Sequence, residues 1–87
     1  MALTRADFEV VLDGIIDNAR RLGLRHVDVC SGDLHRQVGV YPDRDHRMPV
    51  CCRVMRSRMR DLDRVLQEPP SGQGATVLIR YVFGSAQ

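Results

Sequence analysis

Residues 49–83, PVCCRVMRSRMRDLDRVLQEPPSGQGATVLIRYVF, decide the fold, because they combine one amphipathic helix with two strand-like segments. Pro49 suits the first turn of a helix, and six apolar residues after it share one broad arc of the helical wheel: Val50, Cys51, Cys52, Val54, Met55 and Met59. Leu62–Glu68 and Ala75–Phe83 are rich in aliphatic and aromatic residues, and the PPSGQG between them interrupts regular structure. They predict an antiparallel hairpin with a six-residue tip. The second strand should turn one set of alternate residues to the core: Val77, Ile79, Tyr81 and Phe83.

The segment Thr4–Leu22 predicts a helix with one apolar side. Seven apolar residues recur there at the i, i+3, i+4, i+7 spacing: Phe8, Val11, Leu12, Ile15, Ile16, Ala19 and Leu22. Thr4 can serve as the N-cap with Asp7 three residues later, and Gly23 marks the end. The two isoleucines stand at the middle of the apolar side, so we expect them to form the centre of the core.

Between these helices the sequence predicts a short strand, a short helix and a loop. The alternating HVDVC of His26–Cys30 is typical of a strand. Ser31 offers an N-cap for a helix of about two turns that Gly39 ends. Val40–Pro49 holds two prolines and no periodicity, which indicates a loop in which His46 hydrogen-bonds locally and caps the third helix.

The size and composition of the chain limit its class. Its 87 residues, 44% hydrophobic and 28% charged, predict a single folded domain over residues 1–83 with a frayed tail over residues 84–87. A separate cofactor domain is excluded. No apolar run approaches the length of a membrane span and no signal segment precedes the first helix, so we expect a soluble cytoplasmic protein with no membrane partner.

The charge is concentrated in the middle of the chain. All 13 basic residues are arginine, which suits bidentate recognition of phosphate or guanine and equally suits a genome rich in G and C. Residues 1–35 carry four arginines against six acids, whereas residues 36–60 carry seven arginines against two acids. The middle segment is therefore the candidate contact surface.

The order of elements, helix, short strand, short helix, third helix and hairpin, resembles that of a winged helix-turn-helix domain over nearly the whole chain. The resemblance implies a winged-helix-like α+β fold, with three helices, a C-terminal β-hairpin and the short additional strand paired to that hairpin. One feature departs from the pattern. About nine residues connect the second and third helices, where a helix-turn-helix unit has a turn of about three or four.

The stretch SGDLHRQVGVYPDRDHRMPVCCRVMRSRM, with the later PPSGQGAT turn and IRY strand, is also similar to a group of small uncharacterised bacterial proteins that share HRMPVCC. This resemblance covers roughly residues 31–82. It implies a shared domain from a bacterium or a mobile element, and it implies no chemistry.

The arginines of the third helix are the strongest functional signal. Arg53, Arg56 and Arg60 recur at i, i+3 and i+7 on the helix that a winged helix places in the major groove. Ser57 lies among them as a donor to a phosphate or a base. We therefore predict noncatalytic binding of nucleic acid, specifically double-stranded DNA, through this helix and the hairpin. Further contacts to flanking phosphates and an adjacent groove are predicted for Arg36, Arg44, Arg47, Ser71 and Gln73.

Two alternatives to DNA binding stay open. The arginines could form a solvated helix face, paired to Asp61 or Asp63. The chain could also be a protein-interaction module, including a small inhibitor of a nucleic-acid-processing complex, because a net charge of +2 is low for a dedicated DNA-binding protein. Homodimerisation through the first helix or an exposed strand edge is compatible with either function.

Metal binding and catalysis are disfavoured by spacing. Ligand types are present at His26, Cys30, His35, His46, Cys51 and Cys52, but only Cys30 and His35 come near a zinc-ligand spacing. We expect the cysteines to be buried thiols outside any disulfide framework. The sequence holds no GxSxG motif, no phosphate-binding glycine loop, no HExxH motif and no paired carboxylates at a helical spacing inside a plausible pocket. A nuclease would have to use Asp43, Asp45 and His46 of the loop, which is disfavoured. We therefore expect no enzymatic activity, no cofactor and no metal.

Overall fold

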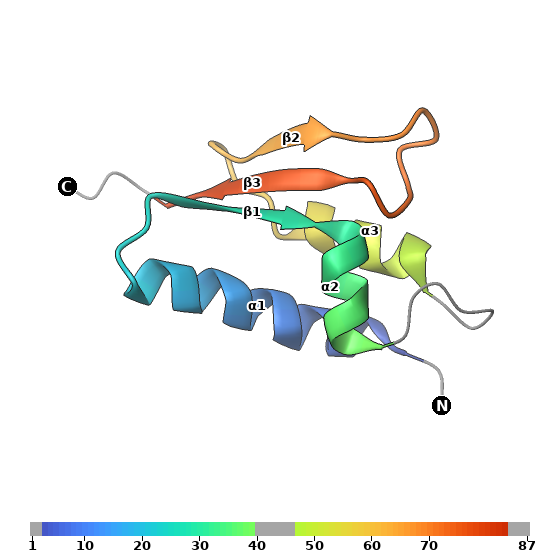
Figure 1. Cartoon of the computed structure of the whole chain (residues 1–87), viewed down its shortest axis with the longest axis horizontal. Coiled ribbons are helices and arrows are strands. Elements are labelled where there is room, and N and C mark those ends of the chain that lie inside the picture. Colours follow the sequence, from blue (N-terminus) through green and yellow to red (C-terminus); the bar gives the residue numbers. More distant parts are fainter. Residues whose placement is uncertain (1–2, 40–46, 84–87) are drawn as a thin grey trace.

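The computed structural model describes residues 3–39 and 47–83, which form three helices and three strands (Figure 1). In chain order these are α1 (Arg5–Arg21), β1 (His26–Cys30), α2 (Ser31–Val38), α3 (Met48–Ser57), β2 (Arg64–Gln67) and β3 (Leu78–Val82). The strands form an antiparallel sheet in the order β1-β3-β2, and the helices cover one of its faces (Figure 1). The protein is therefore α+β with the predicted order of elements. None of the described helices is long and apolar enough to cross a membrane.

The helix α1 begins with the predicted capping box. Thr4 Oγ1 accepts a hydrogen bond from the backbone N–H of Asp7 at 3.4 Å, and Asp7 Oδ2 accepts one from the backbone N–H of Thr4 at 2.8 Å. Each bond satisfies a donor that the first turn of a helix leaves without an internal partner. The helix ends at Arg21, and Gly23 follows with a φ of 80°, a conformation that favours glycine.

One hydrophobic cluster joins the helices to the sheet, and Phe8 and Leu12 are the fully buried side chains that α1 contributes to it. Ile15 and Ile16 are only partly buried at its margin, so the expectation that they form the centre of the core is wrong. The reason is how far along α1 the contacts from α3 and the residues after it extend. The segment after α3 contacts α1 at Asp13, and Ile16 lies beyond that point in the wall of an open hollow.

The strand β1 occupies the predicted residues and pairs with β3 along its whole length, with Val29 opposite Ile79. The predicted N-cap of α2 is wrong. Cys30 is the N-cap residue and makes no side-chain capping bond, while Ser31 is the first helical residue. The backbone N–H groups of Ser31 and Gly32 instead donate to carbonyl oxygens of the hairpin at 2.8 and 3.1 Å. Tertiary contacts therefore replace the local cap that the sequence suggested.

The helix α3 carries Pro49 in its first turn, as predicted, but it begins at Met48 and ends at Ser57. The backbone N–H of its N-cap residue, Arg47, donates to the buried His35 Nε2 at 2.9 Å. This bond fixes the start of α3 to α2. The predicted loop therefore ends before Met48, and the local roles predicted for His46 lie outside the described residues.

The predicted hairpin is confirmed, but the predicted six-residue tip is wrong: both strands are shorter than expected, and residues 68–77 connect them. β2 pairs antiparallel with β3, with an irregularity between Val65 and Gln67. The four alternate residues predicted to face the core are all buried: Val77, Ile79, Tyr81 and Phe83. Tyr81 also donates a hydrogen bond from its hydroxyl to the Met55 carbonyl oxygen at 2.7 Å, and burial raises the pKa of its phenol. The sheet is thereby anchored to the end of α3.

Candidate nucleic-acid interface

The connection between β2 and β3, residues 68–77, is tied to two helices at once. We call this segment the hairpin connection. On the α2 side, the Ser31 hydroxyl donates to the Gly74 carbonyl oxygen at 2.5 Å. On the α3 side, the Cys52 thiol lies 3.5 Å from the same oxygen. The connection therefore lies between the start of α2 and the side of α3, and it does not extend freely from the sheet (Figure 1).

Two glycines make this close approach possible. A Cβ atom at Gly32 would lie 2.9 Å from the Ala75 carbonyl oxygen, a distance that side chains do not tolerate without a shift of the backbone. Gly74 has a φ of 159° and packs against the ring of Pro69. The glycines of the SGD and PPSGQG stretches thus serve one contact between segments that are far apart in the sequence.

Arg56 holds the hairpin connection to α3. Its Nη1 donates to the Gly72 carbonyl oxygen at 2.6 Å, and its Nη2 forms an ion pair with Glu68. The side chain is 33% exposed, so the pair lies at the surface. The helical spacing predicted Arg56 on a DNA-binding face. In the structure its donors are directed to the hairpin connection, which makes it a positioning residue for that segment.

Arg53 and Arg47 are the exposed arginines at α3 that keep their side-chain donors available. Both are exposed, and within the described residues neither guanidinium makes a hydrogen bond or an ion pair. Arg53 lies in the row of α3 next to Arg56, and Arg47 immediately precedes the first turn. The helix itself contains no acidic residue. Within the described residues these two side chains therefore have no compensating carboxylate, and Arg53 lies one turn from Arg56, which holds the hairpin connection.

Ser57 and Arg60 do not fit the predicted helical face. The Ser57 hydroxyl donates to the Val54 carbonyl oxygen at 2.7 Å, so its proton is used inside the helix. Arg60 lies beyond the end of α3, and its backbone N–H donates to Asp63 Oδ2 at 2.7 Å. The i, i+7 relation predicted between Arg53 and Arg60 requires a helix that continues past Ser57. The helix ends at Ser57, so Arg60 does not lie on its surface. Arg60 lines a hollow beside α1 instead.

The remaining predicted contacts flank the hairpin connection. Arg36 forms an exposed ion pair with Asp33 at 3.0 Å. Its Nη1 lies close to Gly32, at 3.4 Å from the position that a Cβ would take there, and Gly32 contacts the hairpin connection. Ser71 and Gln73 are both exposed and hydrogen-bond to each other: the Ser71 hydroxyl donates to the Gln73 carbonyl at 2.8 Å. Arg44 lies outside the described residues.

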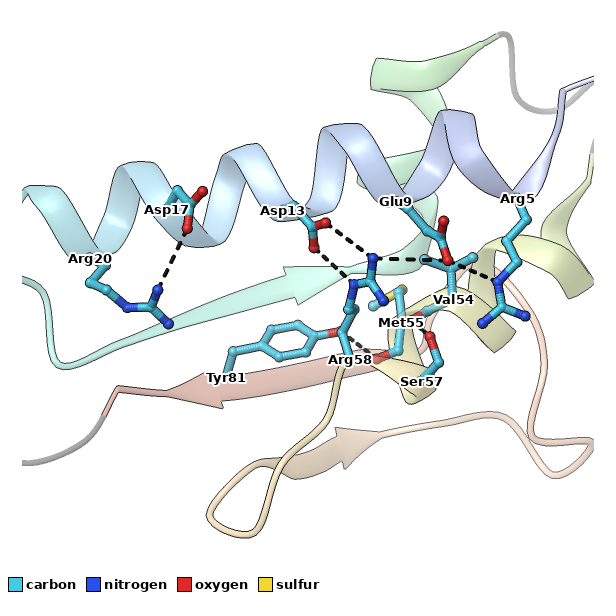
Figure 2. Close-up of polar contacts among 10 residues, drawn as sticks. All are labelled: Arg5, Glu9, Asp13, Asp17, Arg20, Val54, Met55, Ser57, Arg58 and Tyr81. Atoms are coloured by element: carbon cyan, nitrogen blue, oxygen red, sulfur yellow. Dashed lines mark hydrogen bonds and ion pairs between the residues drawn. The ribbon is translucent and has the colours of Figure 1, made fainter.

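Arg58, which no sequence pattern singles out, forms the main polar bridge between α3 and α1. Its Nε and Nη2 donate to the two carboxylate oxygens of Asp13 at 2.9 and 3.1 Å, and Glu9 lies 3.9 Å from Nη2 (Figure 2). The hydrogen bonds to Asp13 raise the pKa of Arg58. No local spacing relates residues so far apart in the chain, so the sequence held no signal for this bridge.

Carboxylate pairing, the alternative interpretation of the arginines, takes a different form from the one expected. In the described residues, the carboxylate partners of arginine side chains are Glu9, Asp13, Asp17, Asp28, Asp33 and Glu68. Asp63 accepts backbone N–H groups, from Arg60 and from Val82. Within the described residues, neither Asp61 nor Asp63 forms an ion pair with an arginine side chain, so the pairing expected for a solvated face is not found. Arg56 pairs with Glu68 instead, and Arg53 is exposed without a carboxylate partner there.

The three thiols lie around the same junction of α2, α3 and the hairpin connection. Cys30 contacts the Ala75 carbonyl oxygen at 3.2 Å, and Cys51 contacts that of Ser31 at 3.6 Å. Burial raises the pKa of the Cys51 thiol to about 12, so the thiol is protonated at neutral pH and is a poor nucleophile. Within residues 3–39 and 47–83, no three His, Cys, Asp or Glu side chains are grouped so that they could hold a metal ion.

The candidate interface thus comprises the exposed arginines at α3 and the polar tip of the hairpin connection, with Arg36 at its border. Its members from the described residues are Arg36, Arg47, Arg53, Ser71 and Gln73. No protein-family model, curated protein or solved structure matches this chain.

Proposed function

We propose that this chain is a winged-helix-like domain that binds double-stranded DNA without catalysis. In this proposal α3 faces the major groove, and the hairpin connection is the wing that contacts the adjacent backbone or groove. The strand order β1-β3-β2 supports it, because the hairpin returns beside the first strand and brings its tip to the side of α3. The long link between α2 and α3 remains a departure from the usual helix-turn-helix unit.

The observation that carries the proposal is the pair of exposed arginines, at the start and in the middle of α3, that have no carboxylate partner among the described residues. The guanidinium groups of Arg47 and Arg53 have no partner among the described residues, whereas that of Arg56 next to them is held by Glu68 and Gly72. Guanidinium groups that are exposed and unpaired can neutralise phosphates without first breaking an internal contact. A wing that hydrogen bonds hold to α2 and α3 restricts how a duplex can approach.

The surrounding charges support the same orientation. Arg36 is paired only with the exposed Asp33, and exposed pairs of this kind contribute little, so a phosphate can replace the carboxylate at small cost. Three of the four acidic residues of α1 are paired with arginines: Glu9 with Arg5, Asp13 with Arg58 and Asp17 with Arg20. At α3, by contrast, Arg47 and Arg53 have no carboxylate partner among the described residues, so a polyanion is favoured at the α3 side.

The test is a salt titration of binding to a fluorescent duplex of random sequence, measured by anisotropy. The double variant Arg47→Gln, Arg53→Gln should bind every duplex more weakly, and the slope of log affinity against log salt should fall by about 0.9 for each phosphate that is no longer neutralised. The matched control is Arg21→Gln, Arg64→Gln, which removes two exposed arginines from other surfaces and should keep the parent slope. Absence of duplex binding by the parent at low salt, or an unchanged slope in the first variant, would contradict the proposal.

A further inference from the structure

A hollow of about 350 Å³ lies between the second half of α1, the end of β3 and the turn after α3. Its apolar walls are the partly buried Ile16 and Val82 and the largely buried Phe83. This end of the molecule lies opposite the hairpin connection (Figure 1). The hollow is therefore separate from the candidate interface at α3.

Large apolar side chains are exposed around this hollow. Leu62 is 62% exposed in the turn after α3, and it lines a second, more open hollow that meets the first at Val82. Leu24 is 49% exposed, and it precedes Arg25, whose carbonyl oxygen accepts a hydrogen bond from the backbone N–H of Phe83 at 2.9 Å. Exposed apolar groups that gather at one place mark contact surfaces. This end of the molecule thus carries an apolar hollow and, beside it, a projecting leucine.

The charged side chains that line the two hollows are of both signs and nearly balance. Four are acidic and three are basic: Asp13, Asp17, Asp61 and Asp63 against Arg20, Arg58 and Arg60. Such a surface selects neither a polyanion nor a polycation, because each would meet like charges as well as opposite ones. A partner that matches it must itself present both signs close together.

Arg60 and Asp61 are the charges of this surface that contacts inside the chain leave available. Both are exposed, and within the described residues neither side chain makes a hydrogen bond or an ion pair. The other charged members are held by hydrogen bonds or ion pairs inside the chain. Arg60 and Asp61 immediately precede Leu62. Three consecutive residues therefore offer a donor, an acceptor and an apolar side chain beside an apolar hollow.

We propose that two copies of the chain meet at this surface about a two-fold axis. Leu62 of each copy enters the hollow of the other, and Arg60 of each copy forms an ion pair with Asp61 of the other. The surface is complementary to itself, because in a two-fold interface each residue meets its partner twice and adjacent opposite charges give two equivalent ion pairs. The contact area is small, so we expect a weak and reversible dimer. It uses no residue of the α3 interface and forms without DNA.

The experiment uses the full chain in analytical ultracentrifugation over a range of concentrations. The parent should dimerise reversibly, and Arg60→Asp and Asp61→Arg should each weaken the dimer about tenfold or more, because each places like charges where the ion pairs form. An equimolar mixture of these two variants should dimerise like the parent, because opposite charges then meet again at both positions. Arg64→Asp makes the same charge change on exposed β2, outside both hollows, and is expected to dimerise like the parent.

The variant Leu62→Ser tests the apolar half of the contact. It should weaken the dimer about tenfold, and its thermal melting should match that of the parent, because Leu62 is mostly exposed within one copy. Dimerisation of this variant at the parent affinity would overturn the proposal. A parent that stays monomeric up to about 1 mM would overturn it and leave the surface to a different partner. A mixture of the two charge variants that stays monomeric, although both melt like the parent, would also overturn it.

Discussion

The contact of Arg56 with the hairpin connection gives a prediction that separates a positioning role from direct DNA contact. The hydrogen bond to Gly72 joins a charged donor to a carbonyl, a type that contributes about 1.5–3 kcal/mol when it is well shielded. The ion pair with Glu68 is partly exposed, and such pairs contribute about 0–1 kcal/mol. Discounting the hydrogen bond for exposure, we expect Arg56→Ala to cost about 1–2 kcal/mol and Glu68→Gln less than about 1 kcal/mol.

Urea denaturation of the two single variants and the double variant measures these costs and the coupling between the two side chains. DNA binding then distinguishes the roles. If Arg56 positions the hairpin connection, Glu68→Gln loosens that segment and weakens duplex binding slightly. If Arg56 contacts a phosphate, Glu68→Gln releases it and strengthens binding. Stronger binding, together with an unchanged stability of Arg56→Ala, would refute the positioning role.

Two further predictions concern stability. Leu12→Ala should lower the free energy of unfolding by about 2–5 kcal/mol, because Leu12 is fully buried. Ile15→Ala should lower it clearly less, because Ile15 is only partly buried. Equal losses of the two variants in urea denaturation would contradict this placement of the core. The hydrogen bonds from Arg80 lower the pKa of Asp28, so this carboxylate stabilises the fold above the unfolded-state pKa of about 3.9 and loses that effect as the pH falls through its lower folded-state pKa. The stability difference between the parent and Asp28→Asn should therefore be present at neutral pH and shrink in acid, and a difference that is independent of pH would argue against it.

The elements themselves could be predicted because their signals are local. The capping pair of Thr4 and Asp7 lies within one helical turn, and the alternation that buries Ile79 and Tyr81 lies within one strand. Such patterns depend only on the periodicity of a helix or a strand. For the same reason the bounds of β1 could be predicted without error.

What the sequence could not provide were contacts between distant segments. Ser31 has the residue type of an N-cap, yet its hydrogen-bond partners are carbonyl groups more than forty positions later in the chain. Arg56 donates to the Gly72 carbonyl oxygen of the hairpin connection, and helical periodicity gives no sign of this contact. The end of α3 also depends on a tertiary contact, because Arg58 turns toward Asp13. A helical wheel continued past Ser57 therefore placed Arg60 on a face that does not exist.

The capping of α2 by the hairpin has a consequence for how the chain acquires its structure. The first N–H groups of α2, at Ser31 and Gly32, find their acceptors at Val77 and Ala75, and β1 finds its partner in β3. During translation the donor N–H groups of α2 leave the ribosome well before their acceptors. Until β3 has been synthesised, α2 therefore lacks its cap and β1 lacks its partner strand. Loop-closure entropy opposes such distant contacts until the last strand is present. Folding of this domain thus depends on the synthesis of β3, and chains that stop before β3 would lack both the cap of α2 and the partner of β1.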